Sequence, residues 1–139
     1  MYASVKSAGV RGLSAELVTV EVDLSSGLPR FDLVGLPNSA VSESKERVRS
    51  AVRNCGFQFP ISRITVNLAP ADLKKEGPAF DLPIALGILC CMGVIDQSAL
   101  EGLCVFGELS LNGAVRPVRG ALPMVISASE QGIEEVILP

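Results

Sequence analysis

The sequence of 139 residues contains no histidine and no tryptophan, and aromatic residues make up only 4% of it. Without histidine, the chain lacks the base that activates serine or cysteine in Ser-His and Cys-His hydrolases, and it lacks the most common acid–base catalyst. Metal sites that combine cysteine with histidine are excluded for the same reason. The few aromatic side chains also supply little surface on which nucleic-acid bases could stack.

Glycine-rich phosphate-binding motifs are missing as well. Neither G-x-x-x-x-G-K-[ST] nor G-x-G-x-x-G occurs, so no loop of this kind can hold nucleotide phosphates. The four cysteines, at positions 55, 90, 91 and 104, include no C-x-x-C pair. We interpret them as reduced thiols that pack as small apolar side chains rather than as metal ligands. We therefore predict no metal, no cofactor and no catalytic residue in residues 1–139.

Long hydrophobic runs are rare. The longest, residues 82–95, is interrupted by Pro83, Gly87 and Gly93, and it predicts a buried helix rather than a membrane span. The chain does not open with a basic segment followed by an apolar stretch, which argues against a secretory signal. We expect a cytoplasmic location and no membrane partner, and the length fits one compact domain.

Charge is unevenly distributed. The net charge is −3, but residues 1–75 carry 10 basic and 7 acidic side chains, whereas residues 76–139 carry 2 basic and 8 acidic ones. An acidic protein is poorly suited to broad, nonspecific binding of a phosphate backbone. The basic excess in the first half still permits a local basic face.

The first third of the chain has the pattern of β structure. Residues 15–24 alternate between apolar and polar side chains, which is typical of a half-buried strand. A turn signal at 25–29 is followed by a second apolar run at 30–37, and the two runs predict a hairpin. The opening residues 2–10 are expected to pair alongside as another strand.

Helical and strand patterns then alternate. A helix is predicted to begin after Asn38 or Ser39 and to end at Gly56, with Glu43 placed to pair with Arg47. We expect, in order, a strand in 59–70, a helix over 79–92, a hairpin over 103–118 with an Asn-Gly turn, a helix over 121–131 and a strand at 134–139. This order predicts one α+β domain with a mixed sheet and helices mainly on one face.

Two segments resemble the proteolytic domain of the Lon family. They are APADLKKEGPAFDLPIALGIL and FGELSLNGAVRPVRGALPM, with GIEEVILP following. In that family a G-P-S-A-G turn presents the nucleophilic serine, and a segment that follows a G-E-x-x-L-x-G-x-V-x-P frame supplies the lysine base. The resemblance implies the fold of domain 2 of ribosomal protein S5. It places Ala79 at the serine position and Met124 at the lysine position, and neither side chain can attack a carbonyl or accept a proton. The fragment is therefore expected not to be an enzyme.

A longer resemblance is to the ComM/YifB family of Mg-chelatase-like AAA+ ATPases. The segments VEVDLSSGLPRFDLVGLPNSAVSESKERVRSAVRNCGFQFP, ITVNLAPADLKKEGPAFDLPIALGIL and GELSLNGAVRPV carry it. The resemblance implies that residues 1–139 form a single degenerate Lon-like domain in front of an AAA+ ATPase module that lies C-terminal to this fragment. That module would bind ATP and Mg²⁺, form a homo-hexamer and act as a DNA branch-migration helicase in natural transformation.

The alternatives are a subunit of a magnesium chelatase-type metallation complex and a protein-docking scaffold without DNA contact. The candidate residues for contact with DNA or a protein partner are basic: Arg47, Arg49, Arg53, Lys74 and Lys75. The partners expected for this domain are its own ATPase module, neighbouring subunits and DNA. The structural interpretation of the same residues is a solvated helix face with ion pairs.

Overall fold

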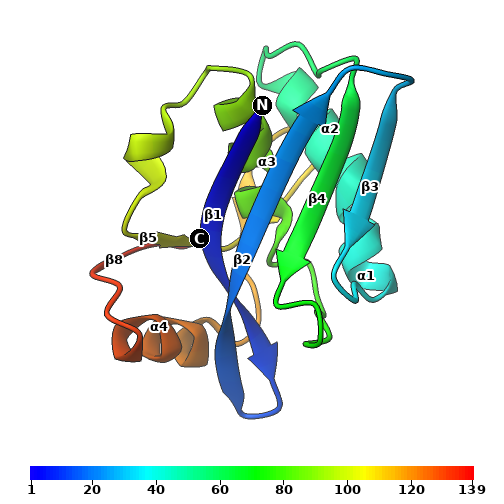
Figure 1. The fold of residues 1–139 in the computed structure, drawn as a ribbon. Helices are drawn as coiled ribbons and strands as arrows, with labels where there is room; N and C mark the ends of the chain where they lie inside the picture. The colour runs from blue at the N-terminus through cyan, green and yellow to red at the C-terminus, as the bar shows by residue number, and fades with distance from the viewer.

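The computed structural model describes residues 1–139, with the side chain of Arg11 excepted. Its main feature is a mixed sheet of six strands in the order β3-β4-β2-β1-β5-β8 (Figure 1). The strands are β1 (Tyr2–Arg11), β2 (Ser14–Ser25), β3 (Arg30–Val34), β4 (Arg63–Ala69), β5 (Leu103–Val105) and β8 (Glu135–Ile137). The α+β class with a mixed sheet, predicted from the order of patterns, is confirmed.

The hairpin of β1 and β2 is the longest ladder in the sheet. It pairs Tyr2 with Asp23 at one end and Arg11 with Ser14 at the other, and Gly12 adopts a left-handed φ of 62° in the turn. The predicted alternation of β2 is confirmed, because Val18, Val20 and Val22 are buried.

The predicted hairpin of β2 and β3 is wrong. Both strands flank β4 instead, β2 antiparallel to it and β3 parallel to it. A parallel pair requires a crossover, and the helices between β3 and β4 supply one. The turn signal at 25–29 marks a change of direction correctly, but it does not specify which strand becomes the neighbour.

The crossover contains two helices where the sequence predicts one. They are α1 (Ser39–Ser42) and α2 (Ser44–Asn54), and the break between them falls at Glu43. The predicted cap is confirmed, because the side chain of Asn38 accepts a hydrogen bond of 2.9 Å from the N–H of Val41. Gly56, with φ of 91°, follows the end of α2 in the expected left-handed conformation.

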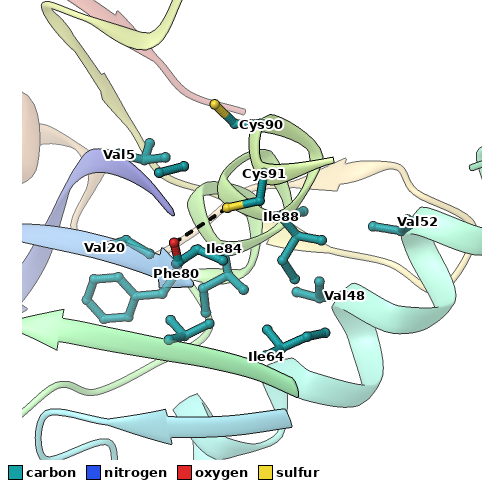
Figure 2. Close-up of a cluster of buried hydrophobic side chains, with 14 of the residues drawn as sticks. Val5, Val20, Val48, Val52, Ile64, Phe80, Ile84, Ile88, Cys90 and Cys91 are labelled. Carbon is teal, nitrogen blue, oxygen red and sulfur yellow. Dashed lines mark hydrogen bonds between the residues drawn. The ribbon is translucent and has the colours of Figure 1, made fainter. Parts of the chain in front are cut away.

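The central helix α3 (Asp81–Cys91) lies against β1 and β2, on the same face of the sheet as α2. Figure 2 shows the core between these elements, with Ile84 and Ile88 of α3 directed toward Val48 of α2 and Ile64 of β4. The thiol of Cys91 points into this cluster and donates to the carbonyl oxygen of Val22 at 3.5 Å. The interpretation of the helical cysteines as packed thiols fits this placement.

The predicted hairpin over 103–118 is only partly correct. The Asn-Gly turn does join two antiparallel strands, β6 (Glu108–Leu109) and β7 (Val115–Arg116), but these form a separate two-stranded ladder. β5, which the prediction placed in the hairpin, instead pairs in parallel with β1 and β8 in the main sheet. The 3₁₀ helix η1 (Gln97–Leu100) precedes β5.

The last helix, α4 (Ala121–Glu130), packs on the opposite face of the sheet. Its buried residues Met124 and Ala128 share a second core cluster with Ala8 of β1, whose side chain points away from α3. α4 covers this face near the β1–β2 turn, beside the hairpin in Figure 1. The expected one-sided arrangement therefore holds for α1, α2 and α3 but not for α4. Among the described residues, no helix combines the length and apolar character that crossing a membrane requires.

Candidate functional site

A cavity of about 690 Å³ lies beside the β1–β2 turn, where several connecting segments meet. Its lining comes from the β1–β2 hairpin (Val10, Gly12), from the start of the crossover (Asn38, Ala40), from the turn before α3 (Glu76, Gly77, Pro78, Ala79), from β6 (Glu108) and from the start of α4 with the segment before it (Pro117, Val118, Arg119, Gly120, Met124). We call this cavity the cleft. Its volume falls within the range of sites that hold small ligands or side chains of a partner, about 300–1,000 Å³.

Ala79 and Met124 both line the cleft, although 45 positions separate them in the sequence. These are the two positions that the Lon resemblance assigns to a nucleophile and a base. Their placement on one cavity is what that assignment requires, and the correspondence itself stays a prediction. Among the described residues that line the cleft there is no serine, threonine, cysteine or lysine.

The corner that carries Ala79 is fixed by backbone hydrogen bonds to Gly107. The N–H of Gly107 donates to the carbonyl of Ala79 at 2.9 Å, and the carbonyl of Gly107 accepts from the N–H of Leu82 at 3.0 Å. A side chain at position 107 would place its Cβ 2.8 Å from Cγ1 of Val115, so glycine permits this close approach. The turn itself contains Gly77 with φ of 80°.

The other wall of the cleft depends on the start of α4. Gly120 precedes the helix with φ of 78°, and a Cβ at this position would lie 2.2 Å from Cγ2 of Val10. The close contact of Gly120 with β1 sets the position of Met124, which is fully buried one turn later. The charged groups on the lining are Glu76, Glu108 and Arg119.

Asp81, immediately behind the cleft, is the centre of a buried polar network. Its Oδ1 accepts from the hydroxyl of Ser44 at 2.5 Å, and its Oδ2 accepts from the Nε of Arg47 at 2.6 Å and from the N–H of Leu109 at 3.0 Å. A second arginine nitrogen, Nη2, donates to Oδ1 at 3.1 Å. The hydrogen bond to Asp81 raises the pKa of Arg47, an effect that burial partly opposes. One carboxylate thus joins α2, α3 and β6.

This network holds the side chain of Arg47 within the fold. Its side chain is 19% exposed and is bound to Asp81, with a longer contact of 3.6 Å to Glu43 in the predicted order. Lys75 is also engaged, because it is only 2% exposed and its ammonium donates to the carbonyl of Pro70. Burial lowers the pKa of Lys75, and the nearby charge of Asp72 opposes that shift. Of the five predicted contact residues, Arg49, Arg53 and Lys74 remain at the surface.

These three surface cations do not lie together. Arg49 and Arg53 line a separate cavity beside Arg30, at the end of the sheet where β3 begins. Lys74 lies at the opposite end, beside Val10 of the β1–β2 hairpin, and contacts Glu76 at 4.0 Å. Among the described residues, no group of three or more metal-binding side chains lies close enough together to hold a metal ion.

Sequence reasoning missed the Arg47–Asp81 pair and the cavity at Arg49 and Arg53. The sequence did contain one signal for the Asp81 network, to which Ser44 belongs. Ser44 lies three residues after Val41 and four before Val48, on the apolar side of the helix. A hydroxyl at such a position requires a buried partner. Nothing in the spacing indicates that this partner lies 37 residues away.

Comparison with known proteins gives the family. Residues 20–139 match the family model described as subunit ChlI of Mg-chelatase. The competence protein ComM of Haemophilus influenzae is 50% identical over 135 residues, which cover 97% of this chain and 26% of that protein. The protein YifB of Salmonella typhimurium is 45% identical over 130 residues, covering 94% of this chain and 26% of that protein.

A more distant similarity points to Lon. Lon protease 2 of Bacillus subtilis is 30% identical over 101 residues, which cover 73% of this chain and 18% of that protein. The chain spans about a quarter of the length of the ComM and YifB relatives. The match to the ChlI model extends over most of the chain. This chain therefore belongs to the Mg-chelatase-like ChlI family, in which its relatives include ComM and YifB.

Proposed function

We propose that this chain is a noncatalytic accessory domain of a cytoplasmic AAA+ motor that acts on DNA as a branch-migration helicase in natural transformation. Family membership supports a domain of an AAA+ protein, and the relative from Haemophilus influenzae is named as a competence protein. The motor module would follow this domain and assemble as a homo-hexamer. It would also hold ATP and Mg²⁺, because residues 1–139 contain no P-loop in which these groups would fit.

The observation that carries the noncatalytic role is the lining of the cleft. Hydrolysis by a Ser-Lys pair needs a hydroxyl nucleophile and an amine that accepts its proton. Ala79 and Met124, which the Lon resemblance assigns to these two roles, supply a methyl group and a thioether to the lining. The fold nevertheless forms a cavity at this corner, which supports binding without cleavage. We also propose that the fold is related to that of domain 2 of ribosomal protein S5.

The role of the domain itself is docking to other proteins, including its own ATPase module and neighbouring subunits. Two of the five basic candidates are engaged inside the fold, and the other three lie at opposite ends of the sheet. Such a distribution does not form the continuous basic track that follows a nucleic-acid backbone. DNA is then handled mainly by the motor module.

The experiment that tests this function uses the longer protein with its ATPase module. Branch migration of a synthetic four-stranded junction is measured with and without ATP and Mg²⁺, for the intact protein and for a version lacking residues 1–139. ATP-dependent migration that slows in the shortened protein, with ATP hydrolysis retained, is the expected result. Absence of any DNA remodelling by the intact protein would overturn the proposal.

The family model itself favours a second candidate, a subunit of a magnesium chelatase-type complex. An assay of Mg²⁺ insertion into protoporphyrin, monitored by the change in porphyrin fluorescence, distinguishes the chelatase function from the helicase function. The same longer protein is used in both assays, so one preparation gives a direct choice between them.

Direct DNA contact by the domain is tested separately. Fluorescence anisotropy of labelled single- and double-stranded DNA is measured with residues 1–139 at several salt concentrations. We expect only weak binding that salt removes and that Arg49→Ala with Arg53→Ala changes little. Strong binding that the double substitution abolishes would make this domain a DNA-contacting element of the motor.

A further inference from the structure

A second cavity, of about 260 Å³, lies on the surface far from the cleft, between α2, the start of β3 and the segment before β4. Three arginines line it, Arg30, Arg49 and Arg53, together with the apolar residues Phe31, Phe59 and Ile61. We call it the arginine pocket. It shares no described lining residue with the cleft.

The floor of the pocket is aromatic. The rings of Phe31 and Phe59 stack with centroids 6.0 Å apart and planes 24° from parallel. The guanidinium of Arg49 lies 6.0 Å and 5.6 Å from the two ring centroids, and that of Arg53 lies 5.9 Å from Phe59. Cation–π contacts of this kind hold the guanidinium groups in place before any ligand arrives, which lowers the entropy lost on binding.

The charge of the pocket is positive. No acidic side chain is among its described lining residues, although the protein as a whole carries a net charge of −3. Arg49 contacts Glu46 at 2.8 Å and Arg30 contacts Asp32 at 3.3 Å, both as solvent-exposed pairs that contribute little and exchange readily. Arg53 forms no ion pair with the described residues. The pocket therefore suits an anion.

The anion is more consistent with a peptide than with a nucleic acid. Bases need free aromatic faces to stack on, whereas here guanidinium groups already lie over the rings. Ile61, at the pocket, is 78% exposed, and an apolar side chain of a partner would cover it. The volume is below that of most small-molecule sites, about 300–1,000 Å³, and suits one bulky side chain.

We propose that the arginine pocket binds a short acidic segment of a partner protein, with one bulky apolar side chain against the exposed Ile61 and neighbouring carboxylates on the guanidinium groups. Arginine forks bind carboxylates with directional, charge-assisted hydrogen bonds, and this gives the site its specificity. The proposal rests on the docking role proposed above and names the chemistry of the partner.

The test uses residues 1–139 and a fluorescein-labelled peptide in which one phenylalanine is flanked on each side by two acidic residues. We expect saturable binding that weakens with added salt and that is lost when alanine replaces the phenylalanine of the peptide. Arg53→Gln should weaken binding roughly fivefold or more, as loss of a charge-assisted contact predicts. Lys45→Gln removes the same charge from the same helix outside the pocket, and it should change affinity by less than roughly twofold.

Ile61→Asp gives a second variant at an exposed position, where folding is not threatened. Its carboxylate should repel the peptide and weaken binding as Arg53→Gln does. Equal weakening by Lys45→Gln, or no binding at low salt, would overturn the proposal. Tighter binding of a single-stranded decanucleotide that competes with the peptide would overturn it in favour of nucleic acid. None of these binding measurements depends on the ATPase module. A negative result would therefore overturn the acidic-peptide proposal alone, and the motor function is tested by the branch-migration assay.

Discussion

The Nε of Arg47 lies 2.6 Å from Oδ2 of Asp81, and this ion pair fastens α2 to the first turn of α3. Asp81 is fully buried, whereas Arg47 is 19% exposed. The carboxylate also accepts hydrogen bonds from Ser44 and from the backbone of Leu109. Both carboxylate oxygens of the buried Asp81 therefore accept hydrogen bonds. The corner that carries Ala79 and shapes the cleft depends on this network.

Replacing Asp81 with alanine should lower the free energy of unfolding by about 3–5 kcal/mol, because it leaves the Arg47 guanidinium and the Ser44 hydroxyl without their acceptor. Urea denaturation followed by circular dichroism measures this loss. Glu43→Ala is the matched control, since Glu43 is 72% exposed and contacts the same arginine at 3.6 Å. That control should lose less than about 1 kcal/mol. Equal losses would show that the buried network is not what stabilises the corner.

Gly87 makes a second close contact of α3, this time with the sheet. A Cβ at position 87 would lie 2.5 Å from Cγ2 of Val22. Alanine is favoured over glycine inside a helix by about 1 kcal/mol, yet Gly87→Ala should destabilise the fold by roughly 1–3 kcal/mol because α3 must move away from β2. Denaturation of the single variants and of the pair Val22→Ala with Gly87→Ala checks this. In the Val22→Ala background the glycine substitution should be neutral or stabilising, and an unchanged loss there would contradict the contact.

The sequence predicted best those features whose signals are local. The cap at Asn38, the end at Gly56 and the alternation of β2 are each encoded within a few residues, and all three are present. The pairing of β2 with β3 failed because strand order depends on long-range packing. The apolar residues Ile64, Val66 and Leu68 of β4 are all buried, so β4 takes a central position between those two strands.

The candidate site shows the same division. Family motifs indicated Ala79 and Met124, and the fold brings both to one cavity. The partner of Arg47 lies 34 residues away, and no helical or strand period connects the two. Arg30 of β3 and Arg49 of α2 line one pocket because α2 belongs to the crossover that connects β3 to β4.

The pH dependence of the free energy of unfolding tests whether the thiol of Cys104 is buried. Burial raises the pKa of its thiol from 9.0 to about 11, so the unfolded chain loses this proton at a lower pH than the folded chain. The free energy of unfolding should then fall as pH rises through this interval, with a contribution from Cys104 on the order of 2 kcal/mol. Denaturation across the interval should show a shallower fall for Cys104→Ala. A native slope in Cys104→Ala would contradict the assignment.

Substitutions of Met124 test whether the cleft can accommodate a charged side chain at this position. Its side chain is fully buried with Phe106 and Ala128 in the second core cluster, and it also lines the cleft. Lysine at this position would lose most of its hydration, which lowers the pKa of the amine below its unfolded value of about 10.4. Met124→Lys should therefore destabilise the fold by several kcal/mol at neutral pH, and the loss should shrink as pH rises through the lowered pKa toward 10.4.

Met124→Leu is the matched control, since it nearly conserves volume and adds no charge, and its loss should stay below about 1.5 kcal/mol at every pH. Denaturation of both variants at several pH values makes the measurement. A loss for Met124→Lys that does not change with pH would mean that the amine reaches water through the cleft. A buried amine beside Ala79 would have no proton to accept, so an apolar side chain at position 124 is the more stable solution once the nucleophile is absent.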